Sequence, residues 1–225
     1  MSLSIQNRLF RGAITILCAT MIGCSTTPSA HTSHVHTVAI SSDSLRSGDL
    51  AFRLGRTLES EAIAAGTEKA ARYSHIGIVV RQADSITIVH IEPSPNSNEQ
   101  VRSDRPEDFF AADRAASGAI FRIKNLSKRQ RDLIKHYALA ATHSLISFDH
   151  DYRLSDTTQM YCTELTEWVY LKAGIELSEG RRHRLPLTTE PIILPRDILA
   201  REDIDMVWEF TYYSDCDRSD TTDRN

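Results

Sequence analysis

The chain has 225 residues, of which 41% are hydrophobic and 25% charged, so it can bury one sizeable core and gives no sign of a second full domain. Its 26 basic and 30 acidic residues give a formal net charge of −4, and the sequence has no basic patch of the kind that binds nucleic acid. These values exclude a nucleic-acid-binding class and favour a single globular domain.

The first 23 residues have the pattern of an export signal. Arg8 and Arg11 form a basic region, residues 12–22 form an apolar one, and no acidic residue occurs before Asp43. An apolar run of this length is too short to span a bilayer, which makes a permanent transmembrane helix the weaker interpretation. We therefore expect residues 1–23 to be a signal peptide.

The end of this apolar run points to lipid attachment. Residues 21–24 read Met-Ile-Gly-Cys and resemble the lipobox of bacterial lipoproteins, in which the chain is cleaved before a cysteine that then carries lipid, palmitate included. Met departs from the usual Leu of that pattern, so cleavage by ordinary signal peptidase is the alternative. Ser25 resembles the sorting signal for the outer membrane. The resemblance implies a lipidated Cys24 and a bacterial outer-membrane lipoprotein that faces the periplasm.

Two flexible segments are predicted to flank the folded part. Residues 24–44 are rich in Ser, Thr and His and lack periodicity, so they are predicted to be a tether. His31, His34 and His36 within it are a metal-binding alternative, although flexible His-rich linkers usually bind nothing specific. Residues 214–225 are polar and acidic and are predicted to be disordered.

The chain has four cysteines, Cys18, Cys24, Cys162 and Cys216. Cys18 would leave with the signal and Cys24 would be lipidated, so Cys162 and Cys216 remain as thiols. Two scattered thiols in an oxidising compartment do not make a disulfide framework.

The folded domain is predicted over residues 45–213. A Gly-Asp turn at residues 48–49 leads into the first strand, and an Ala- and Glu-rich segment with helical propensity follows it. Ser127 and Gln130 match a capping box, which predicts the start of a longer helix. The predicted strands cover residues 50–54, 73–81, 86–93, 118–124 and 206–212, and the predicted helices cover residues 59–71, 105–116 and 127–143.

A hairpin is predicted to bring His75 close to Glu92. The second and third predicted strands are continuous and β-branched, so we expect them to be neighbours joined by a four-residue loop. If Arg81 and Ile86 close that loop, His75 lies opposite Glu92. Directly paired side chains lie about 4.5–5.5 Å apart at Cβ, so the Glu92 carboxylate can orient the His75 imidazole.

The same register places His90 opposite Gly77, two residues along from His75 on the same face of the sheet. His90 is therefore the runner-up for the orienting role. The alternative is that both histidines are hydrogen-bonded sheet residues without a catalytic role.

A cysteine at the predicted start of a helix is the strongest candidate for chemistry. Residues 161–169 carry an apolar stripe at i, i+4, i+7 and i+8, and Gly174 supplies a stop, which predicts a helix that begins near Cys162. A thiol there faces free N–H groups and the positive end of the helix dipole, which can lower its pKa below about 8.5. The alternative is a small buried core residue. Just before this helix, residues 149–151 read Asp-His-Asp and are a second metal-binding alternative to an ordinary solvated loop.

Four stretches together resemble a known family. They are Gly-Asp-Leu at residues 48–50, Ser-His-Ile-Gly-Ile-Val at residues 74–79, the Glu that ends the following strand, and Tyr-Cys-Thr-Glu-Leu at residues 161–165. Over residues 45–212 the chain resembles the YiiX/YebB-like cysteine hydrolases, the circularly permuted papain-fold branch of the NlpC superfamily, which is related to lecithin retinol acyltransferase. In that branch the histidine precedes the cysteine. The resemblance implies an α+β fold in which an antiparallel, barrel-like sheet packs against the helix that carries the cysteine.

The resemblance also implies roles for individual residues. Cys162 would be the nucleophile, His75 the base and Glu92 the third, orienting residue of a triad. The thiolate would attack a carbonyl carbon, and water or another acceptor would resolve the thioester. Helix N–H groups, with Tyr73 or Tyr161, are candidates to stabilise the oxyanion. No metal or other cofactor is expected.

The expected function is that of a cell-envelope cysteine hydrolase. Its substrate would be a cell-wall peptide or a lipid, which makes the protein an amidase, a peptidase or an acyl hydrolase or transferase. We expect it to contact the membrane through its lipid anchor, to bind no nucleic acid and to be a monomer. The alternative is a non-catalytic binding module on the same scaffold, since a fold does not guarantee chemistry.

Overall fold

The structure, a computed structural model, describes residues 42–56, 73–94, 99–185 and 188–212. The predicted signal peptide, most of the tether, the helix expected at residues 59–71 and the acidic tail lie outside these ranges. The described part is a mixed α+β structure with a mostly antiparallel sheet and few helices. No helix in it is long and apolar enough to cross a membrane.

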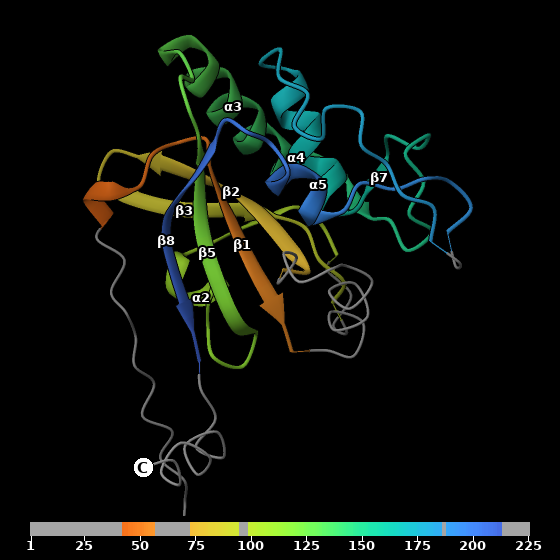
Figure 1. Ribbon diagram of the computed structural model, residues 1–225, viewed down its shortest axis with the longest axis horizontal. Helices are drawn as coiled ribbons and strands as arrows, with labels where there is room; N and C mark the ends of the chain where they lie inside the picture. Colours follow the sequence, from red (N-terminus) through yellow and green to blue (C-terminus); the bar gives the residue numbers. More distant parts are fainter. Residues whose placement is uncertain (1–41, 57–72, 95–98, 186–187, 213–225) are drawn as a thin grey trace, which may run out of the picture. The chain divides into compact units, whose positions relative to one another are not determined.

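The main sheet has six strands, namely β1 (Asp49–Gly55), β2 (His75–Gln82), β3 (Ser85–His90), β4 (Arg102–Asp104), β5 (Ala115–Ile123) and β8 (Ile204–Thr211). Their order is β4-β3-β2-β1-β5-β8, and every neighbouring pair is antiparallel (Figure 1). Two short parallel strands, β6 (Ser147–Phe148) and β7 (Gln159–Met160), form a second sheet. Strand β4 was not predicted.

The helical segments are η1 (Ser42–Ser44), α2 (Pro106–Phe109), α3 (Lys128–Ala141), α4 (Cys162–Leu171) and α5 (Pro195–Leu199). The capping box of α3 is confirmed, because the Ser127 hydroxyl accepts from the Gln130 N–H and the Gln130 side chain accepts from the Ser127 N–H. The predicted helix over residues 105–116 is wrong beyond α2, since β5 already begins at Ala115 and pairs with β1. Helix α5 was not predicted.

The register of the β2–β3 hairpin is confirmed. Arg81 pairs with Ile86, as predicted, and the ladder runs from the pair Ile78 and Val89 to the pair Gln82 and Ser85. The connecting loop therefore has two residues and not the four that were expected. Because the pairing continues through the loop ends without a bulge, the shorter loop leaves every residue on its predicted face.

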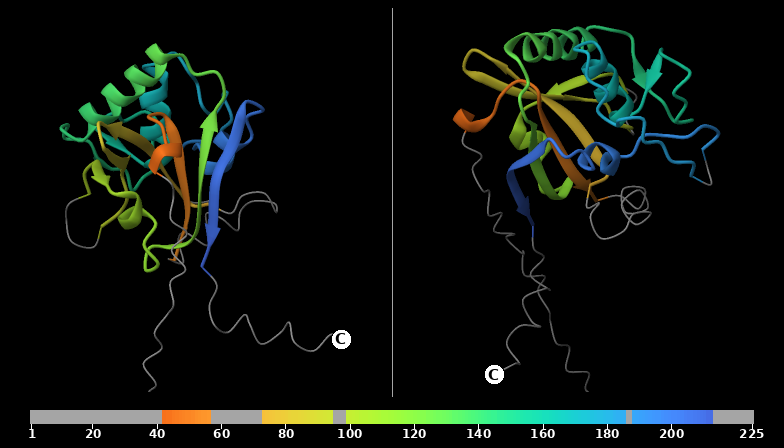
Figure 2. Two further views of the ribbon diagram at one scale, coloured as in Figure 1. Left: turned by 90° about the vertical axis from the view of Figure 1, so that its left-hand side faces the viewer. Right: turned by 45° about the horizontal axis from the view of Figure 1, so that its top comes forward.

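Alternation along the strands divides the core into two clusters, one on each face of the sheet. On β2, Ile76, Ile78 and Val80 belong to the larger cluster, which includes the apolar residues of α3 and α4. Val79 belongs to the smaller cluster, together with Phe109 of α2. Figure 1 and Figure 2 show α3 and α4 beside each other on the same side of the sheet.

Helix α4 is buried over more of its surface than a single apolar stripe would require. Thr163 and Glu167 contact the segment that follows the helix, where the Thr163 hydroxyl donates to the Ile193 carbonyl at 2.7 Å. The buried Glu167 carboxylate accepts from both the N–H and the hydroxyl of Ser178 at 3.0 Å. These bonds satisfy polar groups that burial would otherwise penalise.

The Gly-Asp-Leu motif joins the cysteine helix to the sheet. Gly48 has φ +86°, and its carbonyl accepts a 2.5 Å hydrogen bond from the Tyr170 hydroxyl of α4. The buried Asp49 carboxylate accepts from the Arg46 N–H at 2.8 Å and from the Arg122 guanidinium at 2.7 Å. The motif therefore has a structural role, since it fixes where α4 packs relative to β1.

Candidate active site

Cys162 is the first residue of α4, as predicted, and it retains some contact with solvent. Helix α4 packs against β2 and β3, and backbone hydrogen bonds of Ile76 and Thr163 reach the cysteine thiol. Ile76 follows His75 directly, at the beginning of β2. The fold therefore brings the sulfur next to the strand residue that follows the candidate base.

The pKa of Cys162 differs in direction from the expectation for a helix N-terminus. Burial raises the pKa of this thiol to about 11, although the backbone hydrogen bonds of Ile76 and Thr163 and the charge of Arg53 act to lower it. Desolvation of the charged form therefore outweighs the helix N–H groups. At neutral pH the resting residue is a thiol and not the preformed thiolate that the sequence suggested.

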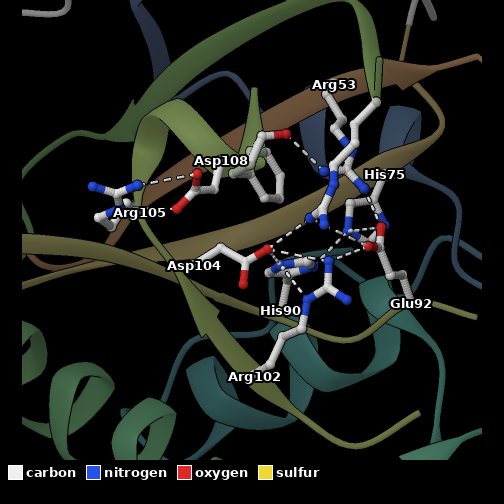
Figure 3. Close-up of polar contacts among 10 residues, drawn as sticks. Arg53, His75, His90, Glu92, Arg102, Asp104, Arg105 and Asp108 are labelled. Atoms are coloured by element: carbon white, nitrogen blue, oxygen red, sulfur yellow. Dashed lines mark hydrogen bonds and ion pairs between the residues drawn. The ribbon is translucent and has the colours of Figure 1, made fainter. Parts of the chain in front are cut away.

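His75 is held by His90. The Nε2 atom of His75 lies 3.0 Å from Nδ1 of His90, and the two rings meet edge to face with centroids 5.1 Å apart. Both rings also pack on Phe109, with centroid distances of 5.6 Å to His75 and 5.0 Å to His90. The imidazole of His75 thus has a fixed plane and one defined hydrogen-bond partner (Figure 3).

Glu92 lies near His75 but is engaged by arginines. Its Oε2 atom is 3.8 Å from Nε2 of His75, which is an ion-pair distance and too long for a hydrogen bond. Arg53 hydrogen-bonds to Oε2 and Arg102 to Oε1 of the same carboxylate. Arg53 pairs directly with His75 across β1 and β2, so the expected partner of the histidine is shared with a cation from the neighbouring strand.

Gly77 explains why His90, the diagonal neighbour of His75 on the next strand, reaches His75, whereas Glu92, the directly opposite residue of the predicted register, does not. A Cβ atom on Gly77 would lie 3.1 Å from Cβ of His90 and 2.5 Å from Cγ2 of Ile88. The missing side chain leaves room for the His90 ring to lean along the face of the sheet. Diagonal pairs lie within the reach of long or aromatic side chains, and here the diagonal pair makes the hydrogen bond.

The chain of polar contacts continues from His90 to strand β4. Nε2 of His90 lies 3.1 Å from Oδ2 of Asp104 and 3.3 Å from Nε of Arg102. The same Asp104 oxygen lies 3.1 Å from Arg102 and 3.0 Å from Arg114. The site is therefore a network of two histidines, two carboxylates and three arginines, drawn in part in Figure 3.

Both histidines are neutral at physiological pH. Burial lowers the pKa of His75 well below 6.5, and the charges of Arg53, His90 and Arg102 act in the same direction. Burial also lowers the pKa of His90, against the opposing effects of Asp104 and Glu92. A neutral imidazole donates through one ring nitrogen and accepts through the other, so the network has a direction.

The two tyrosines proposed for the oxyanion, Tyr73 and Tyr161, both have buried side chains. The Tyr161 hydroxyl accepts from the Ile193 N–H at 2.9 Å, so it anchors the segment after α4. Tyr73 packs in the core, with ring centroids 5.7 Å from Phe52 and 6.2 Å from Phe121. These contacts give both residues a packing role, and their role at the oxyanion stays a prediction.

The metal-binding alternative at residues 149–151 is not supported by the contacts there. The Asp149 carboxylate accepts from the N–H groups of Asp151 and Arg153 and shapes the turn. His150 pairs with Glu99 at 2.8 Å. The side chains of Asp149 and His150 therefore make contacts within the protein that an ordinary loop would make. The histidines of the tether lie outside the described residues.

One group among the described residues has metal-ligand character. His75, His90 and Glu92 each offer a ligand-type atom, and these atoms lie within 4.8 Å of one another. However, Arg53 and Arg102 hold both oxygens of Glu92. A cation would have to displace two guanidinium groups and bear their repulsion, so the residues as arranged do not fit a metal.

Sequence reasoning missed Arg53, Arg102, Asp104 and Phe109. Arg53 carries a weak signal, because it is a charged residue among the apolar residues of the predicted strand 50–54 and shares a face with the alternate residue Ala51. Arg102 and Asp104 lie on a three-residue strand that has no pattern of its own. Only the pairing of that strand with β3 brings them to His90.

Comparisons with known proteins bear on the fold of the chain. No protein-family model matches the chain, and no curated protein does. Among solved structures, the chain is similar to the crystal structure of the metalloprotein YiiX from Escherichia coli O157:H7, with a TM-score of 0.60 and 18% identity over 74% of this chain and 98% of that one. At this identity the likeness concerns the fold alone. The chain therefore has a YiiX-like fold.

Proposed function

We propose that the protein is a cysteine hydrolase with a permuted papain-like fold, in which Cys162 is the nucleophile, His75 the base and His90 the third member. The observations that carry this proposal are the position of Cys162 at the start of α4, with its thiol at the backbone of Ile76, and the hydrogen bond by which His90 holds Nε2 of His75, the residue that precedes Ile76 in the chain. This arrangement has the nucleophile, base and orienting group of a cysteine hydrolase.

The charge states favour general-base activation. Because the Cys162 thiol and His75 are both neutral at rest, the proton moves as the sulfur attacks and not before. Nε2 of His75 faces His90, which leaves Nδ1 as the nitrogen that takes the thiol proton.

The reaction balances with these two residues. The sulfur of Cys162 bonds to a carbonyl carbon while His75 takes its proton. His75 then gives that proton to the departing amine or alcohol as the bond from the carbonyl carbon to that group breaks, which leaves a thioester. Water, deprotonated by His75, attacks the thioester, and the acid and the thiol are released. Backbone N–H groups at the start of α4 are the oxyanion donors that we propose.

A model ester tests the enzymatic proposal. The full chain is incubated with p-nitrophenyl acetate, nitrophenol release is followed, and peptide mass spectrometry locates the acetyl group. We expect an acetylated Cys162 that turns over in water, loss of the acetylation in His75→Ala, and unchanged rates in Cys216→Ser, which removes a thiol outside the described residues.

The alternative is a binding module with an inactive site, and the same experiment distinguishes it. A thiol that is no more reactive than Cys216, with no effect of His75→Ala, would contradict the enzymatic proposal. In that case the polar network around His90 would be a structural element of the sheet.

The similarity to a metalloprotein raises a second alternative, a metal site at His75, His90 and Glu92. The arginines on Glu92 argue against it, and no step of the proposed reaction uses a metal. Equilibrium dialysis with zinc tests the point. One bound zinc ion per chain that is lost in His90→Ala would contradict the hydrolase site described here.

The predicted signal peptide is the argument for a location in the cell envelope. We propose an outer-membrane lipoprotein anchored through Cys24, with a cell-wall peptide or a lipid as substrate. Mass spectrometry of the mature N-terminus is the test, and an unmodified residue other than Cys24 at that end would contradict the anchor.

A further inference from the structure

Asp104 lies at the far end of a continuous row of polar atoms. From the candidate base outward, His75 Nε2 lies 3.0 Å from His90 Nδ1, and His90 Nε2 lies 3.1 Å from Asp104 Oδ2. The side chain of His90 has no exposed surface, and the hydrogen bonds of its ring among the described residues are these two and the contact with Arg102, while the charges of Glu92 and Arg53 also act on it. Asp104 is thus two hydrogen bonds away from the nitrogen that the mechanism uses.

Each hydrogen bond in this row has a donor end and an acceptor end. An ionised carboxylate can only accept, so a hydrogen bond to Asp104 requires a proton on Nε2 of His90. Neutral His90 then has a lone pair on Nδ1 and accepts from Nε2–H of His75. Neutral His75 in turn has its lone pair on Nδ1, where a base must have it. The opposite order would place a proton on that nitrogen and remove the base.

Asp104 is ionised, so it can set this direction. Burial alone would raise the pKa of Asp104, but the hydrogen bond with His90 and the charges of Arg102 and Arg114 hold the pKa well below its usual range. All three partners contact the same oxygen, Oδ2.

Arg102 favours the opposite tautomer of His90. Its Nε–H points at the same His90 nitrogen at 3.3 Å, and a guanidinium can only donate, so it favours a lone pair on Nε2. The contact to Asp104 is shorter, at 3.1 Å, and pairs a donor with an anion. Arg102 also keeps its bonds to Glu92 and Asp104 in either state. The carboxylate therefore decides the tautomer while it is present.

We infer that Asp104 is a positioning residue that fixes the tautomers of His90 and His75 and thereby leaves Nδ1 of His75 free to accept the proton of Cys162. The inference rests on the proposed function for its consequence in catalysis. The tautomers themselves are a property of the folded protein and can be measured without any substrate.

Nitrogen-15 NMR of the imidazoles tests the inference, because long-range correlations distinguish a protonated ring nitrogen from one with a lone pair. In the wild-type chain, we expect protons on Nε2 of both His75 and His90. Asp104→Leu removes the carboxylate at similar volume and leaves Arg102 as the polar neighbour of His90 Nε2. We expect both tautomers to reverse, with protons on Nδ1.

Two further variants separate this role from a merely structural one. Asp104→Asn retains an oxygen that can accept from His90, so it should keep the wild-type tautomers. Asp108→Leu removes a nearby ion pair with Arg105 that touches neither histidine, so it should change nothing in the imidazole spectrum (Figure 3). Acetylation of Cys162 should slow about 10²- to 10⁴-fold in Asp104→Leu and recover substantially in Asp104→Asn.

The outcomes are distinguishable. Wild-type tautomers in folded Asp104→Leu would overturn the inference, whatever the enzymatic rates are. If the tautomers reverse as expected but wild-type Cys162 is never acetylated, the inference about Asp104 stands and the proposed function fails. If Asp104→Leu does not fold, a proton on Nδ1 of either histidine in the wild-type chain is enough to overturn the inference.

Discussion

Replacing Gly77 with alanine should disturb the candidate site through a single methyl group. The new Cβ would lie 2.5 Å from Cγ2 of Ile88, 3.1 Å from the Val89 carbonyl oxygen and 3.1 Å from Cβ of His90. Contacts below 3.0 Å do not persist, so the side chains or the strands must move. Ile88 is fully buried and branched at Cβ, which leaves it few other rotamers.

The magnitude follows from these contacts. Overpacking a well-packed core usually costs about 1–3 kcal/mol, and we expect Gly77→Ala to fall in that range. Because Cβ of His90 is one of the atoms that the new methyl group contacts, the His90 ring should move and lengthen the 3.0 Å hydrogen bond to His75. A misplacement of about 1 Å in a catalytic group can cost about 10²-fold in rate, so acetylation of Cys162 should slow by about that factor.

The assay compares Gly77→Ala with a matched control, Gly174→Ala. Gly174 has φ +77° and no atom within 4 Å of an added Cβ, so its substitution costs about 1–2 kcal/mol of backbone strain and creates no steric contact. Urea unfolding should show similar losses of stability in the two variants, whereas only Gly77→Ala should acetylate slowly. Equal acetylation rates in both variants and the wild type would refute the idea that the position of His90 controls His75.

Three further predictions concern the site and its helix. Cys162→Ser should reduce acetylation about 10³-fold or more with an unchanged melting temperature, and retained activity would contradict a covalent mechanism. His90→Ala should slow acetylation more than Glu92→Gln, because His90 makes the hydrogen bond to His75; the reverse order, measured in the same ester assay, would restore Glu92 as the third member. Burial raises the pKa of Glu164 from its ordinary 4.5 to about 8, so between these pH values the unfolded chain loses a proton that the folded chain keeps, and stability falls as pH rises. In urea unfolding, the free energy of unfolding of Glu164→Gln should therefore rise relative to that of the wild type by up to about 1.4 kcal/mol per pH unit in that window. A difference in unfolding free energy that does not change with pH would contradict the shift.

The sequence alone determined the parts of this protein that follow from local rules. The pairing of Arg81 with Ile86, the capping box of α3 and the start of α4 at Cys162 all agree with the structure. Each depends on residues close together in the chain, where alternation, capping chemistry and helical periodicity leave few choices. The predicted proximity of His75 and Glu92 followed from the same register, and Oε2 of Glu92 does lie 3.8 Å from Nε2 of His75.

Only the tertiary structure decided which neighbour holds His75 and in what state Cys162 rests. The choice between Glu92 and His90 depends on arginines from β1 and β4, which draw the carboxylate away. Local pattern carries no information about such contacts between distant strands. The pKa of Cys162 likewise depends on how completely the surrounding chain desolvates the thiol, and this burial outweighs the helix terminus that the sequence revealed. Register can be inferred from neighbours in sequence, whereas competition among charges and the loss of solvent are set by residues that meet only in the folded protein.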